Sequence, residues 1–184
     1  GTEGDDLFFV LYRVVGPGTA IMAETKKGER LSVLGPLGKG FEIPKNNQIP
    51  LLVAGGIGVA PLIFLAQTVK SRPVQFMMGF GSASEIIAID WMGRLPVDVS
   101  IATDDGTSGH AGPVTDLLEA YLRQNRGLKD SLSVFTCGPG PMLKKLAALT
   151  IDHDIPCQVS MEAAMACGLG ACQGCAVKAS SDEK

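Results

Sequence analysis

The chain has 184 residues and a net charge of −3, with 46% hydrophobic and 19% charged residues. This composition supports a folded core, and the acidic balance argues against a general nucleic-acid or anionic-membrane binder, which needs a basic face. No apolar run reaches the roughly 18 residues of a membrane span, and no basic signal peptide opens the chain. We therefore expect one or two compact domains with no nucleic-acid or membrane partner.

The first 45 residues combine strand patterns with glycine–proline turns. Residues 7–15 and 30–34 are predicted strands, and a short helix is expected over 20–25. Before that helix, Thr19 offers a hydroxyl beside free N–H groups, a possible phosphate seat, although such turns are also common between strands. This pattern indicates the end of an antiparallel barrel, whose first strands we expect before Gly1 because an incomplete barrel leaves open edges.

From residue 46, strand and helix patterns alternate. Strands are predicted over 49–54, 74–79, 97–103, 132–137 and 158–161. Helices are predicted up to residue 70 after the first strand, and over 84–92, 114–126 and 141–149. Ser84 is expected to be the N-cap of the second helix, and Gly127 to end the third. Regular alternation indicates a parallel sheet covered on both faces, so the fold class is α/β.

Three turns at strand ends carry candidate cofactor contacts. The turn 55–61 (GGIGVAP) allows a pyrophosphate to approach a helix N-terminus, although it lacks the full G-x-G-x-x-G fingerprint and also fits a ligand-free turn. Asp104 and Asp105 follow the third strand, where they would bind a ribose or form an acidic turn. Cys137 ends the fourth strand, where its thiol would touch a cofactor ring or be a small buried residue.

Five cysteines without a secretory signal favour reduced thiols in a cytoplasmic protein over a disulfide framework. Cys167, Cys172 and Cys175 have the spacing C-x4-C-x2-C, the three-cysteine part of a plant-type [2Fe–2S] loop. Glycines between them let the backbone wrap a cluster and direct N–H groups at the sulfurs. Zinc is the alternative, although tetrahedral zinc sites usually pair two knuckles. A fourth ligand is expected beyond Lys184.

In this order, the motifs resemble the ferredoxin–NADP reductase superfamily and, within it, the electron-transfer subunits of class 1B dihydroorotate dehydrogenases. The most specific stretch, 161–175 (MEAAMACGLGACQGC), is similar to the cluster signature of those subunits. The resemblance implies part of an FAD-binding barrel over 1–45, an NAD-binding domain over 46–155 and an incomplete cluster segment over 156–184. It implies FAD contacts at Gly16, Gly18, Thr19, Gly35, Pro36, Leu37 and Gly38. It implies NAD contacts at Gly55, Gly56, Gly58, Ala60, Pro61, Asp104, Asp105, Gly138 and Pro139.

The resemblance also implies an FMN-containing partner subunit that oxidises dihydroorotate in pyrimidine biosynthesis. Electrons would pass through the [2Fe–2S] cluster and FAD to NAD, with Cys137 supporting the hydride geometry. We expect NAD rather than NADP, because Asp104 or Asp105 would repel a 2′-phosphate and no Arg or Lys stands near. Two alternatives remain: a related reductase subunit serving a hydrogenase or sulfite reductase, and a non-catalytic zinc-binding interaction module.

Overall fold

A parallel sheet of six strands, in the order β4-β3-β2-β1-β5-β6, forms the centre of the molecule. The computed structural model describes residues 7–44, 47–69, 73–87, 90, 93, 95–161 and 165–177. The strands are β1 (Ile49–Gly55), β2 (Val74–Phe80), β3 (Val97–Thr103), β4 (His110–Ala111), β5 (Leu132–Gly138) and β6 (Cys157–Met161). The predicted α/β class is confirmed, and the five predicted strands of this sheet match to within one residue at each end.

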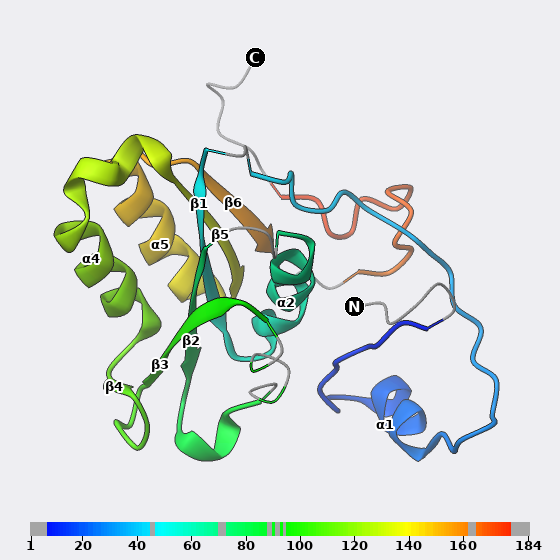
Figure 1. The fold of residues 1–184 in the computed structure, drawn as a ribbon. Coiled ribbons are helices and arrows are strands. Elements are labelled where there is room, and N and C mark those ends of the chain that lie inside the picture. Colours follow the sequence, from blue (N-terminus) through cyan, green and yellow to red (C-terminus); the bar gives the residue numbers. More distant parts are fainter. Residues whose placement is uncertain are drawn as a thin grey trace.

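Helices cover both faces of the sheet (Figure 1). On one face α2 (Val59–Thr68) packs on β1 and β5, and on the other α4 (Val114–Gln124) and α5 (Gly140–Asp152) pack on the sheet and on each other. Three short 3₁₀ segments complete these connections: η1 (Gly56–Gly58), η2 (Ala83–Glu85) and η3 (Arg126–Ser131). Within the described residues, no helix combines the length and the apolar character that a membrane crossing requires.

The core lies on both sides of the neighbouring strands β1 and β5. Every residue of β5 is buried, as is β1 from its second residue onward, which explains their continuous apolar sequences. Leu52 and Phe135 belong to the cluster under α2, whereas Leu51 and Val134 belong to the cluster under α4 and α5. These buried strands form a rigid frame that holds the turns at their carboxyl ends in fixed positions.

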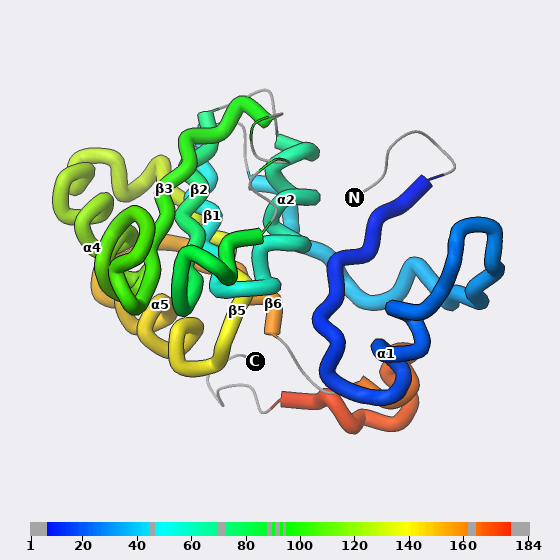
Figure 2. Tube along the Cα trace, turned by 90° about the horizontal axis from the view of Figure 1, so that it is seen from below, coloured from blue at the N-terminus to red at the C-terminus, as the bar shows by residue number. Residues whose placement is uncertain are grey.

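The N-terminal region, residues 7–43, lies beside the sheet and outside both helix layers (Figure 2). The strands predicted over 7–15 and 30–34 are not formed, since the described part of this region has only an isolated bridge at Phe8. An extended segment becomes a strand only with a hydrogen-bonded neighbour, and the described chain supplies none here. The short helix is present as α1 (Pro17–Glu24), but it buries none of its residues.

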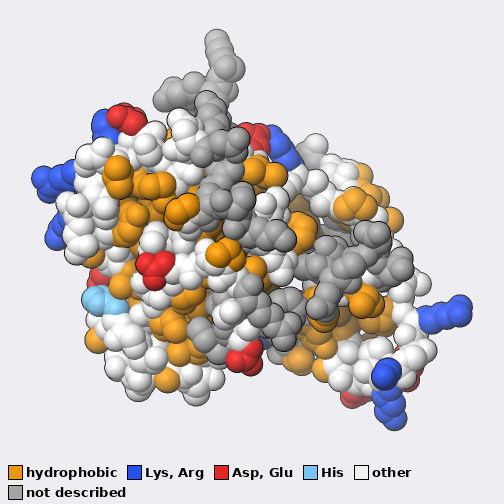
Figure 3. All heavy atoms as spheres, viewed as in Figure 1, with side chains coloured by type: hydrophobic (Ala, Val, Ile, Leu, Met, Phe, Trp, Pro, Cys, Tyr) orange, Lys and Arg blue, Asp and Glu red, His pale blue; other side chains and the backbone are white. Residues whose placement is uncertain are grey.

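Large apolar side chains remain exposed in this region, where Figure 3 shows hydrophobic surface on the side of α1. Phe8 is 59% exposed and Val15 is 79% exposed. So many exposed large apolar side chains in one region are unusual on an isolated domain and are typical of a face that another structural element covers.

The helix predicted over 84–92 does not begin at Ser84. Residues 83–85 form the short η2, and Ile86 is extended, with φ −65° and ψ 119°. Of the later residues, Asp90 is helical. Ser84 lies inside η2 and does not cap a helix, while the remaining predicted residues 88–89 and 91–92 lie outside the described residues. Ile86 packs against the core, so burial of its side chain outweighs the local helix pattern.

Two other helix ends differ from the prediction. The helix predicted over 114–126 ends at Gln124, before Gly127, because η3 follows directly. The last helix is longer than predicted, running over α5 to Asp152. The two-residue strand β4 was not predicted, since two residues carry no periodic signal.

Candidate functional site

The carboxyl ends of β1, β2, β3 and β5 surround a cavity of about 530 Å³. Its volume is in the range of small-molecule sites. The chain runs outward from β1 to β4 and then returns to β5, so the cavity lies at the point where the strand order reverses. Backbone-rich turns form much of the wall, including Gly55, Gly56, Gly79, Gly81, Asp104 and Pro139.

The glycine turn after β1 has two separate roles. Gly55 and Gly56 line the cavity, and Gly56 has a φ of +52°, in the region that favours glycine. A Cβ on Gly56 would meet nothing nearer than an Arg13 guanidinium nitrogen at 4.0 Å. Gly58 is instead buried, and a Cβ there would lie 2.2 Å from the carbonyl oxygen of Cys137. The first two glycines therefore face the cavity, whereas Gly58 allows η1 to pack against the end of β5.

The turn after β5 is equally crowded. A Cβ on Gly138 would lie 2.9 Å from the backbone nitrogen of Gly55 and 2.5 Å from the methyl carbon of Met142. Pro139, next in the chain, lines the cavity. Gly138 and Pro139, the two NAD contacts predicted here, therefore lie next to the glycine turn after β1. Pro139 lines the cavity, and Gly138 packs behind it.

The two acidic residues after β3 have different surroundings. Asp104 lines the cavity. The carboxylate of Asp105 accepts hydrogen bonds from the Thr107 backbone N–H at 3.0 Å and from the Thr107 hydroxyl at 2.6 Å. These bonds, the hydroxyl's above all, lower the pKa of Asp105. Asp105 therefore forms the acidic turn, and Asp104 is the one of the two that lines the cavity.

Sequence reasoning missed three charged residues of the cavity wall: Arg13, Glu85 and Lys145. A carboxylate oxygen of Glu85 accepts a hydrogen bond from the Gly81 N–H at 3.3 Å. Lys145 donates to Asp116 at 2.9 Å, and this bond is the main cause that lowers the pKa of Asp116. Lys145 lies in the second turn of α5, the helix after β5, and this position was a usable signal. Nothing local in the sequence connects Arg13 to this cavity.

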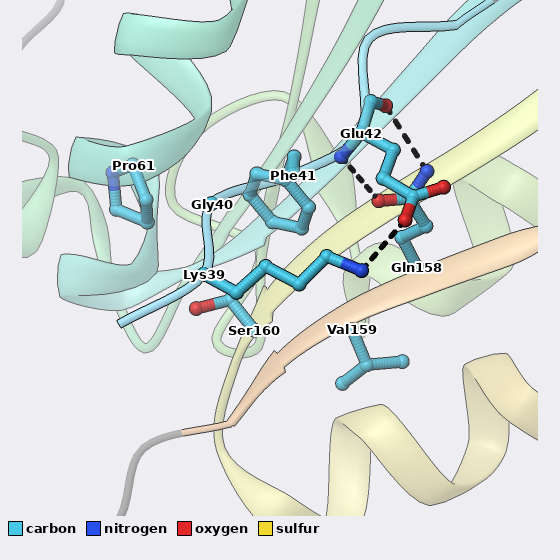
Figure 4. A pocket seen from close by; sticks show the side chains of 8 residues that line it. All are labelled: Lys39, Gly40, Phe41, Glu42, Pro61, Gln158, Val159 and Ser160. Atoms are coloured by element: carbon cyan, nitrogen blue, oxygen red, sulfur yellow. Dashed lines mark hydrogen bonds and ion pairs between the residues drawn. The ribbon is translucent and has the colours of Figure 1, made fainter. Parts of the chain in front are cut away.

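A second cavity, of about 480 Å³, lies by the edge strand β6 (Figure 4). The lining residues come from the segment after α1, the start of α2 and β6: Lys39, Gly40, Phe41, Glu42, Pro61, Gln158, Val159 and Ser160. Pro61 of the predicted NAD turn thus lines this cavity, while Ala60 lies in the first turn of α2. Phe41 meets the ring of Phe135 edge-on, with ring centroids 5.7 Å apart.

Cys137 is buried, 4% exposed, in the core cluster under α2. It is not among the lining residues of either cavity, but its register partner on β6, Ser160, lines the second one. Cys157 packs toward the opposite face of the sheet, and burial raises the pKa of its thiol. Both cysteines therefore belong to the sheet and not to the C-terminal cysteine loop.

The cysteine loop directs backbone N–H groups at its sulfurs. Leu169 and Cys172 donate to the Sγ of Cys167 at 3.4 and 3.5 Å, and Gly174 donates to the Sγ of Cys172 at 3.5 Å. These bonds, chiefly that from Cys172, lower the pKa of Cys167 to about 6. Cys172 is exposed and Cys167 and Cys175 are partly buried. The loop thus favours the thiolate of Cys167, the form that binds metals, although no three metal-ligating side chains of the described residues converge on one position.

The two predicted flavin turns both lie in the N-terminal region. Thr19 closes the start of α1, where its hydroxyl oxygen accepts hydrogen bonds from the N–H groups of Val15 at 3.0 Å and Gly16 at 3.2 Å. The turn 35–38 lies beside the cysteine loop, because a Cβ on Gly168 would be 3.0 Å from the Leu37 side chain. Figure 1 shows the segment after α1 passing next to the cysteine loop.

Comparison with solved structures defines the class of fold. A structure described as an NADH-dependent reduced ferredoxin–NADP oxidoreductase matches 89% of this chain and 58% of its own, with 28% identity and a TM-score of 0.75. A ferredoxin–NADP⁺ reductase from Neisseria gonorrhoeae, solved with FAD and NADP, matches 80% of this chain and 69% of its own, at 17% identity and a TM-score of 0.55. The fold is therefore of the ferredoxin–NADP reductase type.

Sequence comparison is more specific. A protein of Desulforamulus reducens is 38% identical over 173 residues, which cover 93% of this chain and 64% of the relative. One of Clostridium perfringens is 36% identical over 184 residues, covering 99% of this chain and 71% of the relative. Both are named dihydroorotate dehydrogenase B (NAD(+)), electron transfer subunit, and this chain belongs to that family. The chain spans about two-thirds of these relatives' length, and no family model matches it.

Proposed function

We propose that this protein is the electron-transfer subunit of an NAD-dependent dihydroorotate dehydrogenase of pyrimidine biosynthesis. The observation that carries this proposal is the position of one short segment, residues 35–42. Leu37 lies against the cysteine loop, and five residues later Glu42 is hydrogen-bonded to Gln158 of the sheet. The segment that the family resemblance assigns to the flavin therefore touches both the cysteine loop and the sheet that carries the dinucleotide cavity.

NAD exchanges a hydride and an iron–sulfur cluster exchanges single electrons, whereas a flavin does both, so FAD is the cofactor needed between them. We assign residues 1–45 to the flavin side, 46–155 to the NAD side and 156–184 to the cluster. The exposed apolar residues of the N-terminal region support the completion of a flavin-binding barrel by protein segments other than those described. The length of the relatives agrees with this, because the matched part covers 64% of the Desulforamulus reducens protein.

The larger cavity has the features of a dinucleotide site. Gly56 leaves open backbone at the cavity before α2, and Gly55, packed against Met142 and Pro139, lines the cavity beside it. The N–H groups and the dipole at the start of α2 favour a pyrophosphate. Asp104 would accept a hydrogen bond from a ribose hydroxyl, and Glu85 adds a second carboxylate to the wall. Contrary to the expectation from sequence, two cations line the same cavity as Asp104. Lys145 is already paired with a carboxylate of α4, and the Arg13 guanidinium lies at the glycine turn, 4.0 Å from the Cβ position of Gly56. With Asp104 and Glu85 in the same wall, the preference for NAD over NADP stays part of the proposal.

The cysteine loop has the spacing and the N–H donors of an iron–sulfur ligand loop. Cys167, Cys172 and Cys175 would supply three thiolates, and a residue outside the described ones would supply the fourth ligand. Because Cys172 is exposed, the loop is open to a second protein. We assign this face to the partner, an FMN-containing subunit that oxidises dihydroorotate.

The full-length protein, produced together with its candidate catalytic subunit, allows a direct test. We expect flavin and iron–sulfur absorption bands and NAD reduction when dihydroorotate is supplied. A complex that holds both flavins and the cluster but reduces no NAD with dihydroorotate would reject the assignment of the substrate. Zinc in place of iron, without flavin, would instead support the interaction module.

A further inference from the structure

The side chain of Gln158 makes two hydrogen bonds to the backbone of one distant residue. The Glu42 N–H donates to the Gln158 amide oxygen at 2.8 Å, and the Gln158 amide nitrogen donates to the Glu42 carbonyl oxygen at 3.1 Å. Figure 4 shows both bonds beside the second cavity. A side-chain amide offers the same donor and acceptor as a peptide group. Gln158 therefore holds the Glu42 backbone as a neighbouring strand would.

A second contact joins the residue before Glu42 to the strand next to Gln158. Phe41 precedes Glu42 and packs its ring edge-on against Phe135. Phe135 of β5 is the register partner of Gln158 on β6. Two consecutive residues of the N-terminal region thus dock on two paired residues of the sheet, one by an apolar contact and one by a pair of hydrogen bonds. This arrangement fixes both the position and the orientation of the segment.

The docked segment connects two parts of the site. At one end Leu37 contacts the cysteine loop at Gly168, and at the other Glu42 is held by β6. The second cavity lies between this segment, Pro61 at the start of α2, and β6. Its lining includes Ser160, the register partner of Cys137. The segment therefore joins the region assigned to the flavin with the edge strand next to Cys137.

We propose that Gln158 is a positioning residue for hydride transfer between flavin and NAD, an inference that rests on the proposed function. Gln158 would act through Glu42 and would touch neither cofactor itself. It fixes residues 41 and 42 against the sheet, and it would in this way help to position the flavin side against the NAD side. A displacement of about 1 Å at such a junction changes a transfer rate by roughly a hundredfold.

Two substitutions separate the contributions of the two hydrogen bonds. Gln158→Leu has a similar volume and removes both bonds. Gln158→Glu keeps an acceptor for the Glu42 N–H but loses the donor to the Glu42 carbonyl. The matched control is Gln124→Leu, which makes the same change at an exposed residue at the end of α4, in the opposite helix layer. All variants are made in the full-length protein with its cofactors bound.

Two measurements test the proposal. The first is hydrogen exchange at the Glu42 amide, which we expect to be at least about tenfold faster in Gln158→Leu. The second is stopped-flow reduction of the flavin by NADH, where we expect a rate roughly 10- to 100-fold lower with the NADH dissociation constant within about threefold of the wild type. Gln158→Glu should lie between wild type and Gln158→Leu, and Gln124→Leu should match the wild type in both measurements.

The outcomes are distinguishable. Unchanged exchange at Glu42 would show that Gln158 does not hold this segment. Faster exchange with a wild-type rate of flavin reduction would reduce Gln158 to a purely structural role and overturn the proposal. If Gln158→Leu does not fold, Gln158→Glu decides by the same two readouts. A wild-type flavin that NADH does not reduce would reject the proposed function, and the positioning role with it, while the exchange data would still report the contact itself.

Discussion

Replacing Gly58 by alanine should destabilise the protein far more than its small size suggests. The new Cβ would lie 2.2 Å from the carbonyl oxygen of Cys137, 2.5 Å from its carbonyl carbon and 2.9 Å from the nitrogen of Gly138. These are backbone atoms of a central buried strand, so no side chain can rotate away. Normal contact would require η1 and β5 to separate by roughly 1 Å or more. Overpacking of this kind costs about 3 kcal/mol.

Gly56→Ala provides the matched control two residues earlier. Its Cβ would meet nothing within 4 Å except one Arg13 nitrogen at that limit, so the cost is limited to the left-handed backbone, about 1 kcal/mol. Thermal unfolding of the full-length proteins measures the difference, which we expect to be several degrees, at about 2–4 °C per kcal/mol. NADH binding should weaken in Gly56→Ala, because that Cβ enters the cavity. Equal melting temperatures for the two variants would refute the packing role assigned to Gly58.

Three further predictions concern the cofactor contacts. Asp104→Ala should raise the KM for NADH roughly tenfold and reduce the preference of the enzyme for NADH over NADPH, because the acceptor for a ribose hydroxyl is lost. Comparable turnover of the wild-type protein with both nucleotides would contradict the assignment. Cys137→Ala should slow NADH–flavin transfer roughly tenfold and leave the iron–sulfur bands intact, and loss of those bands would instead make Cys137 a ligand. Replacing Cys167, Cys172 or Cys175 by serine should abolish NAD reduction by dihydroorotate in the complex. NADH-driven reduction of an artificial flavin acceptor should survive. Full dihydroorotate–NAD activity in these variants would exclude electron transfer through the cysteine loop.

The centre of the sheet was predictable because β1, β2 and β5 are almost wholly buried and carry short, largely apolar runs. The start of the helix predicted over 84–92 was misplaced, because Ser84 as an N-cap signal carries no information about the packing of Ile86 and Ile87 on the core. The N-terminal strands failed for a different reason. Residues 7–15 have strand-forming side chains, but strand formation also depends on a neighbour that the local sequence does not describe.

The candidate site was predictable where one turn carries its own signal. The glycines after β1 indicated a close backbone approach, but only coordinates separate Gly56 at the cavity from Gly58 against Cys137. Asp104 and Asp105 are equivalent in sequence, and the Thr107 hydrogen bonds distinguish them. Contacts such as that between Gln158 and the Glu42 backbone, 116 residues apart, leave no local pattern at all.

The most direct test of the central claim is an anaerobic titration of the full-length protein with NADH, followed by visible absorption. The account predicts that the purified protein shows both flavin and iron–sulfur bands and that NADH bleaches both. Bleaching of the flavin with the iron–sulfur bands unchanged would contradict the connection between the segment 35–42 and the cysteine loop. A colourless protein that retains zinc would contradict the account as a whole.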